Sequence, residues 1–304
     1  MPTIDPTSIE NRNIIIYVHG TFSAAKTVTK GYLWNGTQVK TGLRDFTQEN
    51  INEGDVGEVS VASKLKNNEH DSVADRIAQL MVLTQLDNPL VCVFGWSGSI
   101  NTMEREEGGF YLAKILKALQ GRGNTVHVIT HSHGGNVLGH ALTYFAPRPG
   151  GVIAQAYLFA CPFFRGKRAG TFRVERDLDG FRFIKTAMVL RVSDENLWQL
   201  SPTSPGHPQG AQARVKDYVH NFYNPVDAVQ VHGAGAAKGT VSNYTNFLLP
   251  EFSYNLNGTA LVRNYCINPG GSRYDGKTAH TDMNHAFAYE LAATEVRLRN
   301  LRGN

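Results

Sequence analysis

The chain has 304 residues, of which 41% are hydrophobic, 18% charged and 10% aromatic, and its 30 basic and 26 acidic residues give a formal net charge of +4. This composition argues against a disordered, collagen-like or coiled-coil protein. A net charge this small does not indicate a nucleic-acid-binding protein. The longest apolar runs are far shorter than the roughly 18 residues of a membrane-spanning helix, so we expect a soluble globular protein.

The N-terminal sequence lacks the basic start and the apolar stretch of a secretory signal. The three cysteines lie far apart in the sequence, and an odd number of widely spaced cysteines is typical of buried free thiols rather than of a disulfide scaffold. We therefore expect a cytoplasmic protein with reduced thiols, while export by a route independent of the Sec machinery stays open.

Short runs rich in β-branched and aromatic residues alternate with longer helical patterns. The predicted strands span residues 14–18, 90–95, 126–130, 156–160, 187–192, 218–223 and 261–267. The predicted helices, with apolar residues at three- and four-residue spacing, span residues 73–86, 109–120, 135–145 and 284–298. This alternation is typical of βα units around a buried parallel sheet, and it predicts a single doubly wound α/β domain over residues 1–304.

Three segments between the predicted elements read as insertions in this domain. They span residues 163–186, 196–214 and 232–259, and two of them contain stretches rich in Pro, Gly, Ser or Ala. None interrupts the alternation for long enough to indicate a second domain. One of these segments is a candidate lid over the site.

The segment around Ser132 is the most informative one for chemistry. A predicted strand enters it, a predicted helix leaves it, and it reads Thr130-His131-Ser132-His133-Gly134. A nucleophile at such a junction needs small neighbours two positions away, because its backbone takes a strained conformation. Ser132 is therefore the candidate nucleophile. The alternative is a serine that only caps the following helix.

Residues 130–134 resemble the Gly-x-Ser-x-Gly nucleophile elbow of the α/β-hydrolases, with Thr130 in place of the first glycine. The resemblance implies an α/β-hydrolase fold, in which helices flank a mostly parallel central sheet. It also implies a Ser-His-Asp triad whose members follow in the chain order serine, acid, histidine. The parts of this site occur in that order between residues 14 and 285, so the resemblance covers most of the chain.

The acid and the base of the triad are expected downstream of the elbow. A predicted strand and a tight Asn-Pro turn lead to Asp227, while Asp194, which also follows a predicted strand, is the reserve candidate. His280 is the preferred base because it falls in a predicted loop, whereas His285 falls where the helical pattern has begun. In such a triad Ser132 attacks the ester, His280 takes its proton and Asp227 orients the imidazole.

Upstream of the elbow, a predicted buried strand ends in His19-Gly20. In α/β-hydrolases a strand that ends this way leads into the oxyanion loop, and a glycine there lets the chain approach the substrate closely. The resemblance therefore implies that the backbone N–H of Thr21 or Phe22 and that of His133 stabilise the oxyanion.

Aromatic residues at the expected site favour an apolar, lipid-like substrate. Trp96 follows the strand before the elbow strand, at the edge where open parallel sheets bind ligands, and it either lines the pocket or packs in the core. Phe22 and the Phe-Phe pair at residues 163–164 fall in neighbouring loops, and Arg165 and Lys167 could contact a phosphate. We expect a carboxylic-ester hydrolase of lipase, phospholipase or esterase type that needs no cofactor and contacts a membrane or micelle surface transiently.

Two other classes stay open. A metal-dependent hydrolase would use the His131/His133 pair, because His-x-His begins the metallo-β-lactamase motif, but Gly135 and Asn136 stand where that motif has an Asp and a further His. A non-catalytic binding protein of the same fold would show a distorted triad. Residues 271–278 match the phosphate-loop pattern Gly-x4-Gly-Lys-Thr, but no later strand follows to supply a magnesium-binding Asp, so we interpret them as a plain loop.

Overall fold

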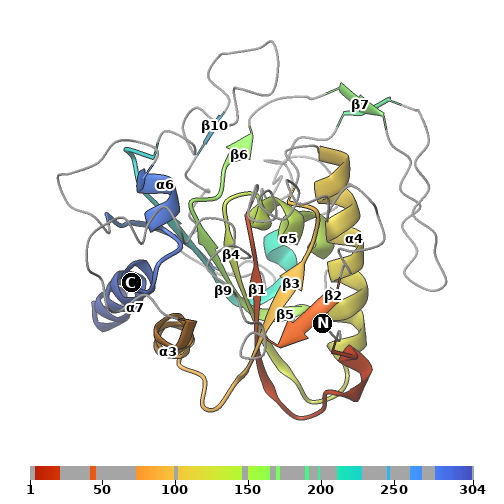
Figure 1. Ribbon diagram of the computed structural model, residues 1–304, viewed down its shortest axis with the longest axis horizontal. Helices are drawn as coiled ribbons and strands as arrows, with labels where there is room; N and C mark the ends of the chain where they lie inside the picture. The colour runs from red at the N-terminus through yellow and green to blue at the C-terminus, as the bar shows by residue number, and fades with distance from the viewer. Residues whose placement is uncertain are drawn as a thin grey trace.

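The computed structural model describes residues 4–20, 42–45, 73–98, 102–145, 150–164, 169–171, 189–191, 198, 211–227, 245–246, 261–268 and 278–302. These residues form three layers, with a central sheet between two pairs of helices (Figure 1). The predicted α/β fold is therefore confirmed.

The central sheet has seven strands in the order β11-β9-β5-β4-β1-β3-β2. Their bounds are β1 Asn13–Val18, β2 Gly42–Asp45, β3 Leu90–Gly95, β4 Thr125–His131, β5 Ile153–Phe159, β9 Val215–Tyr223 and β11 Leu261–Cys266. All neighbours pair in parallel except β2, which runs antiparallel to β3 at one edge. The chain passes from β1 to β3 on one side and then crosses to β4 on the other, so the direction of winding switches at β1 and β4. Open α/β sheets bind their ligands at the carboxyl ends of strands beside such a switch.

Side chains of β1 explain why its sequence is an unbroken apolar run. Ile14, Ile16 and Val18 face one hydrophobic core cluster, while Ile15 and Tyr17 face the other, as expected for a parallel strand covered on both faces. The first cluster packs under α4 (Thr102–Leu119) and α5 (Gly134–Thr143), and the second under α3 (Val73–Thr84) and α7 (Ala286–Leu301). Both faces of the sheet are therefore covered where the central strands lie.

Helix α4 begins at Thr102, earlier than the predicted helix over residues 109–120. The predicted helix began at Gly109, the second residue of a glycine pair, and glycine lowers helix propensity. In the structure the pair lies inside the helix, and a Cβ atom on Gly109 would lie 2.5 Å from the Cβ of His140 in α5. Gly109 therefore allows α4 and α5 to pack closely on the sheet.

The remaining described elements are short. They are the 3-10 turns Pro6–Ser8 and Ala211–Arg214, the strands β6 Phe163–Phe164, β7 Ala169–Thr171, β8 Val189–Arg191 and β10 Thr245–Asn246, and the helix α6 Thr278–Asp282. β6 pairs with β10, and β7 pairs with β8, both antiparallel and both outside the central sheet. Two of the predicted insertions, residues 163–186 and 232–259, thus meet through β6 and β10.

The predicted strand at residues 187–192 is not part of the central sheet, which corrects that prediction. The residues described there, Val189–Arg191, form a strand that pairs with β7. A short apolar run has the same pattern in a local ribbon as in a buried central strand, so the sequence alone did not separate the two.

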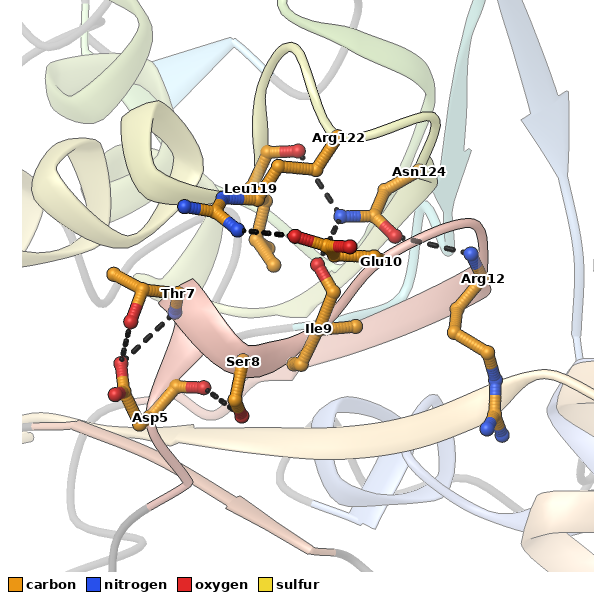
Figure 2. A network of polar contacts seen from close by, with 9 residues as sticks. All are labelled: Asp5, Thr7, Ser8, Ile9, Glu10, Arg12, Leu119, Arg122 and Asn124. Atoms are coloured by element: carbon orange, nitrogen blue, oxygen red, sulfur yellow. Dashed lines mark hydrogen bonds and ion pairs between the residues drawn. The ribbon is translucent and has the colours of Figure 1, made fainter.

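The segment before β1 is held against the connection between α4 and β4 (Figure 2). Asn124 donates from its side chain to the carbonyl of Ile9 at 2.9 Å and accepts from the backbone N–H of Arg12 at 3.0 Å. Arg122 forms an ion pair with Glu10 at 2.7 Å, on the exposed side. These contacts set the register at which β1 enters the sheet beside β4.

All three cysteines are free. Cys92 and Cys161 are buried as expected, but Cys266 is exposed, because it is the last residue of the edge strand β11 and its side chain falls on the outer side of the alternation. No helix in the described ranges is long and apolar enough to cross a membrane.

Candidate active site

Ser132 lies in the tight turn between β4 and α5. Its φ of 52° is in the left-handed region, which residues other than glycine rarely adopt. Its backbone N–H donates to the carbonyl of Phe159, the last residue of β5, at 2.8 Å, and its own carbonyl accepts from the N–H of Gly135 at 3.1 Å. The side chain is buried, with 3% of the residue exposed. The strand–turn–helix junction predicted from the sequence is therefore present, with the serine at its strained position.

Glycines on both sides make this turn sterically feasible. A Cβ atom on Gly134 would collide with the carbonyl oxygen of Val18 at the end of β1, and one on Gly20 would lie 2.7 Å from the Cβ of Ser132. The sequence suggested that Gly20 allows a close approach to substrate. The structure shows that the close approach is to the serine itself.

Asp227 and His280 form the second half of the site. The Nδ1–H of His280 donates to Oδ2 of Asp227 at 2.7 Å, and the two residues are 6% and 0% exposed. Asp227 follows β9 in a turn where its N–H donates to the carbonyl of Asn224 at 3.0 Å and Val226 donates to the Asn224 side chain at 3.1 Å. This Asx-type turn lies at the tight Asn-Pro turn that the sequence predicted, and it aims the carboxylate at the imidazole.

The backbone at the two candidate histidines differs from the prediction. His280, predicted in a loop, lies in the short helix α6. His285, predicted inside the helical pattern, has an extended backbone and is the N-cap residue before α7. A five-residue helix contains too little periodicity to be recognised in a sequence.

His131 connects the two halves of the site. It is the last residue of β4 and directly precedes Ser132, and its Nε2–H donates to the backbone carbonyl of His280 at 2.9 Å. The rings of His131 and His280 also pack against each other, with centroids 4.9 Å apart. The elbow and the Asp227–His280 pair therefore meet at the carboxyl edge of the sheet.

Electrostatics keep His131 neutral. Burial, followed by the neighbouring His280, lowers the pKa of His131 well below its ordinary value. Because a carbonyl can only accept, the neutral ring carries its proton on Nε2. His131 was not assigned a structural role in the sequence analysis, since its partner lies 149 residues away in the chain.

His133, the predicted oxyanion donor, lies at the N-terminal end of α5. Its ring Nδ1–H donates to the side-chain oxygen of Asn136 at 2.9 Å, and Asn136 donates to the carbonyl of Pro162 at 3.1 Å. N–H groups in the first turn of a helix point out along its axis, and this end of α5 lies at the turn that holds Ser132. Thr21 and Phe22, the other predicted donors, and the reserve acid Asp194 lie outside the described residues.

Trp96 packs in the core, which decides between its two interpretations. It is 1% exposed and belongs to a hydrophobic core cluster. Its indole N–H donates to the carbonyl of His19 at 2.8 Å, and its ring stacks on the His19 ring at 5.6 Å. Trp96 therefore supports the end of β1 beside Gly20.

The His131/His133 pair is not arranged as a shared metal site. His131 binds the carbonyl of His280, whereas His133 binds Asn136. Within the described ranges, no group of three or more His, Cys, Asp or Glu side chains is placed to hold a metal ion.

Cys161, the buried thiol nearest the elbow, is not an activated nucleophile. Its Sγ lies 3.3 Å from the hydroxyl of Thr130, beneath the start of α5. Burial raises the pKa of the Cys161 thiol to about 12, and a neutral thiol is a poor nucleophile.

No protein-family model matches this chain, and no curated protein has a significantly similar sequence. The functional argument therefore depends on the geometry of the site.

Proposed function

We propose that the protein is a serine hydrolase of the α/β-hydrolase superfamily that cleaves carboxylic esters through an acyl-enzyme. The observation that carries this proposal is the meeting of a strained Ser132 with a buried Asp227–His280 pair through His131. A strained serine has no reason to persist at a helix cap, which an ordinary backbone serves equally well. Backbone strain of this kind is typical of functional sites.

The positions of the three residues in the sheet support the same assignment. Ser132 follows β4 in the centre of the sheet, Asp227 follows β9, and His280 comes after β11. This is the chain order serine, acid, histidine of the superfamily, and the serine lies on a strand-to-helix turn as in its nucleophile elbow. β1, which is followed by His19-Gly20, lies directly beside the elbow strand, as expected for a strand that leads into an oxyanion loop.

In the proposed reaction, Ser132 Oγ forms a bond to the ester carbonyl carbon while His280 Nε2 takes the hydroxyl proton. Asp227 keeps the proton of His280 on Nδ1 and stabilises the imidazolium that forms. The tetrahedral oxyanion accepts hydrogen bonds from backbone N–H groups, of which that of His133 is one candidate. Collapse of this intermediate breaks the bond to the leaving alcohol, which takes the proton from His280. Water then attacks the acyl-enzyme while His280 takes one of its protons, and the second collapse breaks the bond to Ser132 Oγ, returns the proton to that oxygen and releases the acid.

The proposed substrate is a lipid-like ester. Since Trp96 packs in the core, this part of the proposal depends on the aromatic residues at position 22 and at positions 163–164 of the sequence. Val226, directly before Asp227, supports it as well, because this apolar side chain is 49% exposed beside the site. Transient contact with a membrane or micelle surface follows from the same argument.

Labelling with a fluorophosphonate tests the mechanism. We expect the purified protein to take up one label, mapped by mass spectrometry to Ser132, and the Ser132→Ala variant to take up none. Activity that survives the phosphonate and disappears with a chelator would contradict the proposal and support a metal-dependent enzyme. A folded protein that neither labels nor hydrolyses any ester would indicate a binding protein.

A second experiment tests the substrate class. Esters with the same acyl group are compared below and above their critical micelle concentrations, along with a series of p-nitrophenyl esters of increasing chain length. We expect the rate to rise with chain length and at the interface. A preference for short, monomeric esters would reject a lipid-like substrate and leave an esterase.

A further inference from the structure

His131 makes two separate contacts with the candidate catalytic histidine. Its Nε2–H donates to the backbone carbonyl of His280 at 2.9 Å, and its ring packs on the His280 ring with 4.9 Å between centroids. His131 itself is 3% exposed and lies at the last position of β4, paired in register with Phe159 of β5. It is therefore fixed by the most buried part of the sheet.

His280 needs such an anchor because its own element is small. α6 has five residues, and an isolated helix of that length has no stability of its own. The bond from Asp227 fixes the Nδ1 atom of His280 but leaves the ring free to pivot about that atom. The hydrogen bond from His131 to the backbone carbonyl of His280, and the packing of the His131 ring against the His280 ring, remove this freedom.

The charge state of His131 suits this position. A cation beside His280 would oppose the imidazolium that forms on His280 in the transition state. Burial lowers the pKa of His131, and its charged or titratable neighbours His280, His285 and Arg76 lower it further. His131 therefore offers a hydrogen-bond donor to α6 without adding a positive charge.

We propose that His131 is a positioning residue, which holds α6 and the His280 ring at the distance and angle from Ser132 that proton transfer requires. This inference rests on the proposed serine-hydrolase function. His131 directly precedes the candidate nucleophile Ser132, and a nucleophile elbow does not by itself require this residue to position the catalytic histidine.

The test compares substitutions at His131 with the same substitution at a matched site. His131→Phe keeps a planar ring and removes the donor. His127→Phe is the control, because His127 is a buried histidine four residues earlier on the same strand and its ring stacks on Tyr157, at 6.0 Å, instead of on His280. His131→Gln retains an N–H donor at about the reach of Nε2, whereas the amide of His131→Asn is too short.

The readouts are kcat, KM, the rate of fluorophosphonate labelling and the Tm. We expect His131→Phe to lower kcat and the labelling rate together by about 10- to 100-fold, the range expected for a misplaced catalytic group, with little change in KM. His131→Gln should recover most of this loss, while His127→Phe should retain the wild-type rate with a comparable change in Tm.

Three results would overturn the inference. The first is a labelling rate of His131→Phe within about twofold of wild type, and the second is an equal loss of rate in the His127→Phe control. If His131→Phe does not fold, the Gln and Asn variants decide, and equal rates in these two would be the third. Failure of the wild-type protein to label is a distinct outcome, which contradicts the proposed function and this inference with it.

Discussion

Gly20 and Ser132 approach each other so closely that a single methyl group does not fit between them. A Cβ atom on Gly20 would lie 2.7 Å from the Cβ of Ser132 and 3.1 Å from Nδ1 of His131. Gly20 follows β1 and Ser132 follows β4, and these two strands are parallel neighbours in the sheet. The turn that holds the candidate nucleophile is therefore shaped by the strand beside it as well as by its own sequence.

Gly20→Ala should lower activity through this contact. The φ of Gly20 is outside the left-handed region, so alanine suits the backbone and the cost is steric. We expect Ser132 and His131 to be displaced and kcat/KM to fall by at least about tenfold, while the protein stays folded. Steady-state kinetics and circular dichroism check this. Wild-type kinetics in Gly20→Ala would show that the turn relaxes without consequence.

Two substitutions of the nucleophile should differ in stability although both abolish activity. Ser132→Ala keeps the Cβ at a φ of 52°, whereas Ser132→Gly removes it and relieves the strain. We expect both to lose at least about 10³-fold in ester hydrolysis. In urea, Ser132→Gly should be more stable than Ser132→Ala by about 1 kcal/mol. The opposite order would argue that the serine is not strained.

The acid and the base are tested by paired substitutions. His280→Ala and Asp227→Asn should each be nearly inactive, because an amide opposite Nδ1 favours the wrong tautomer and costs about 10⁴-fold in a triad. His285→Ala and Asp194→Asn should retain part of the activity. If the second pair is inactive and the first is active, the acid and base assignments are wrong even though the serine assignment stands.

Buried histidines should make the stability of the protein fall in mild acid. Burial lowers the pKa of His127 to about 4 and that of His220 to about 3. The unfolded chain, with ordinary histidines near 6.5, binds more protons than the folded one below that pH. Stability is therefore full above about pH 6.5 and declines as the pH falls toward 4, by up to about 1.4 kcal/mol per pH unit for each histidine.

This pH dependence can be assigned to individual residues by urea unfolding at pH 7 and at pH 5. His127→Phe should lose less stability between the two pH values than the wild type does, since its phenyl ring takes up no proton. Identical losses in the two proteins would show that His127 is not the group that titrates.

The sequence predicted the parts of the fold that have strong local patterns. β1 is an unbroken apolar run and α5 follows small residues at a strand end, so the elbow between β4 and α5 was recognisable before the structure. β8 was placed in the central sheet because a three-residue apolar strand carries no information about its partner. Trp96 stayed ambiguous because core and pocket both favour a large apolar ring.

The candidate site residues could be predicted where the sequence around them carries a local signal. They could not be predicted where their role depends on contacts between segments that are distant in the chain. Asp227 was chosen for the strand and Asn-Pro turn before it, and His280 for its place in a predicted loop within the expected chain order, and the structure places Nδ1 of His280 2.7 Å from Oδ2 of Asp227. The bond from His131 to the carbonyl of His280 and the hydrogen bonds of Asn136 have no local signal, because backbone acceptors do not depend on residue type. The turn at Asn224 was predicted, since Asn-Pro is a common turn initiator.

The order of strands distributes the candidate triad unevenly over the sheet. Ser132 follows β4, which has a neighbour on each side, whereas His280 follows β11, an edge strand with β9 as its one neighbour among the described strands. Edge strands and short helices open at lower free energy than a central strand does. During synthesis the histidine also emerges last. If the proposed function holds, hydrolytic competence would therefore be the last property that the chain gains as it folds and the first that it loses when its edge opens, while the candidate nucleophile stays protected in the centre.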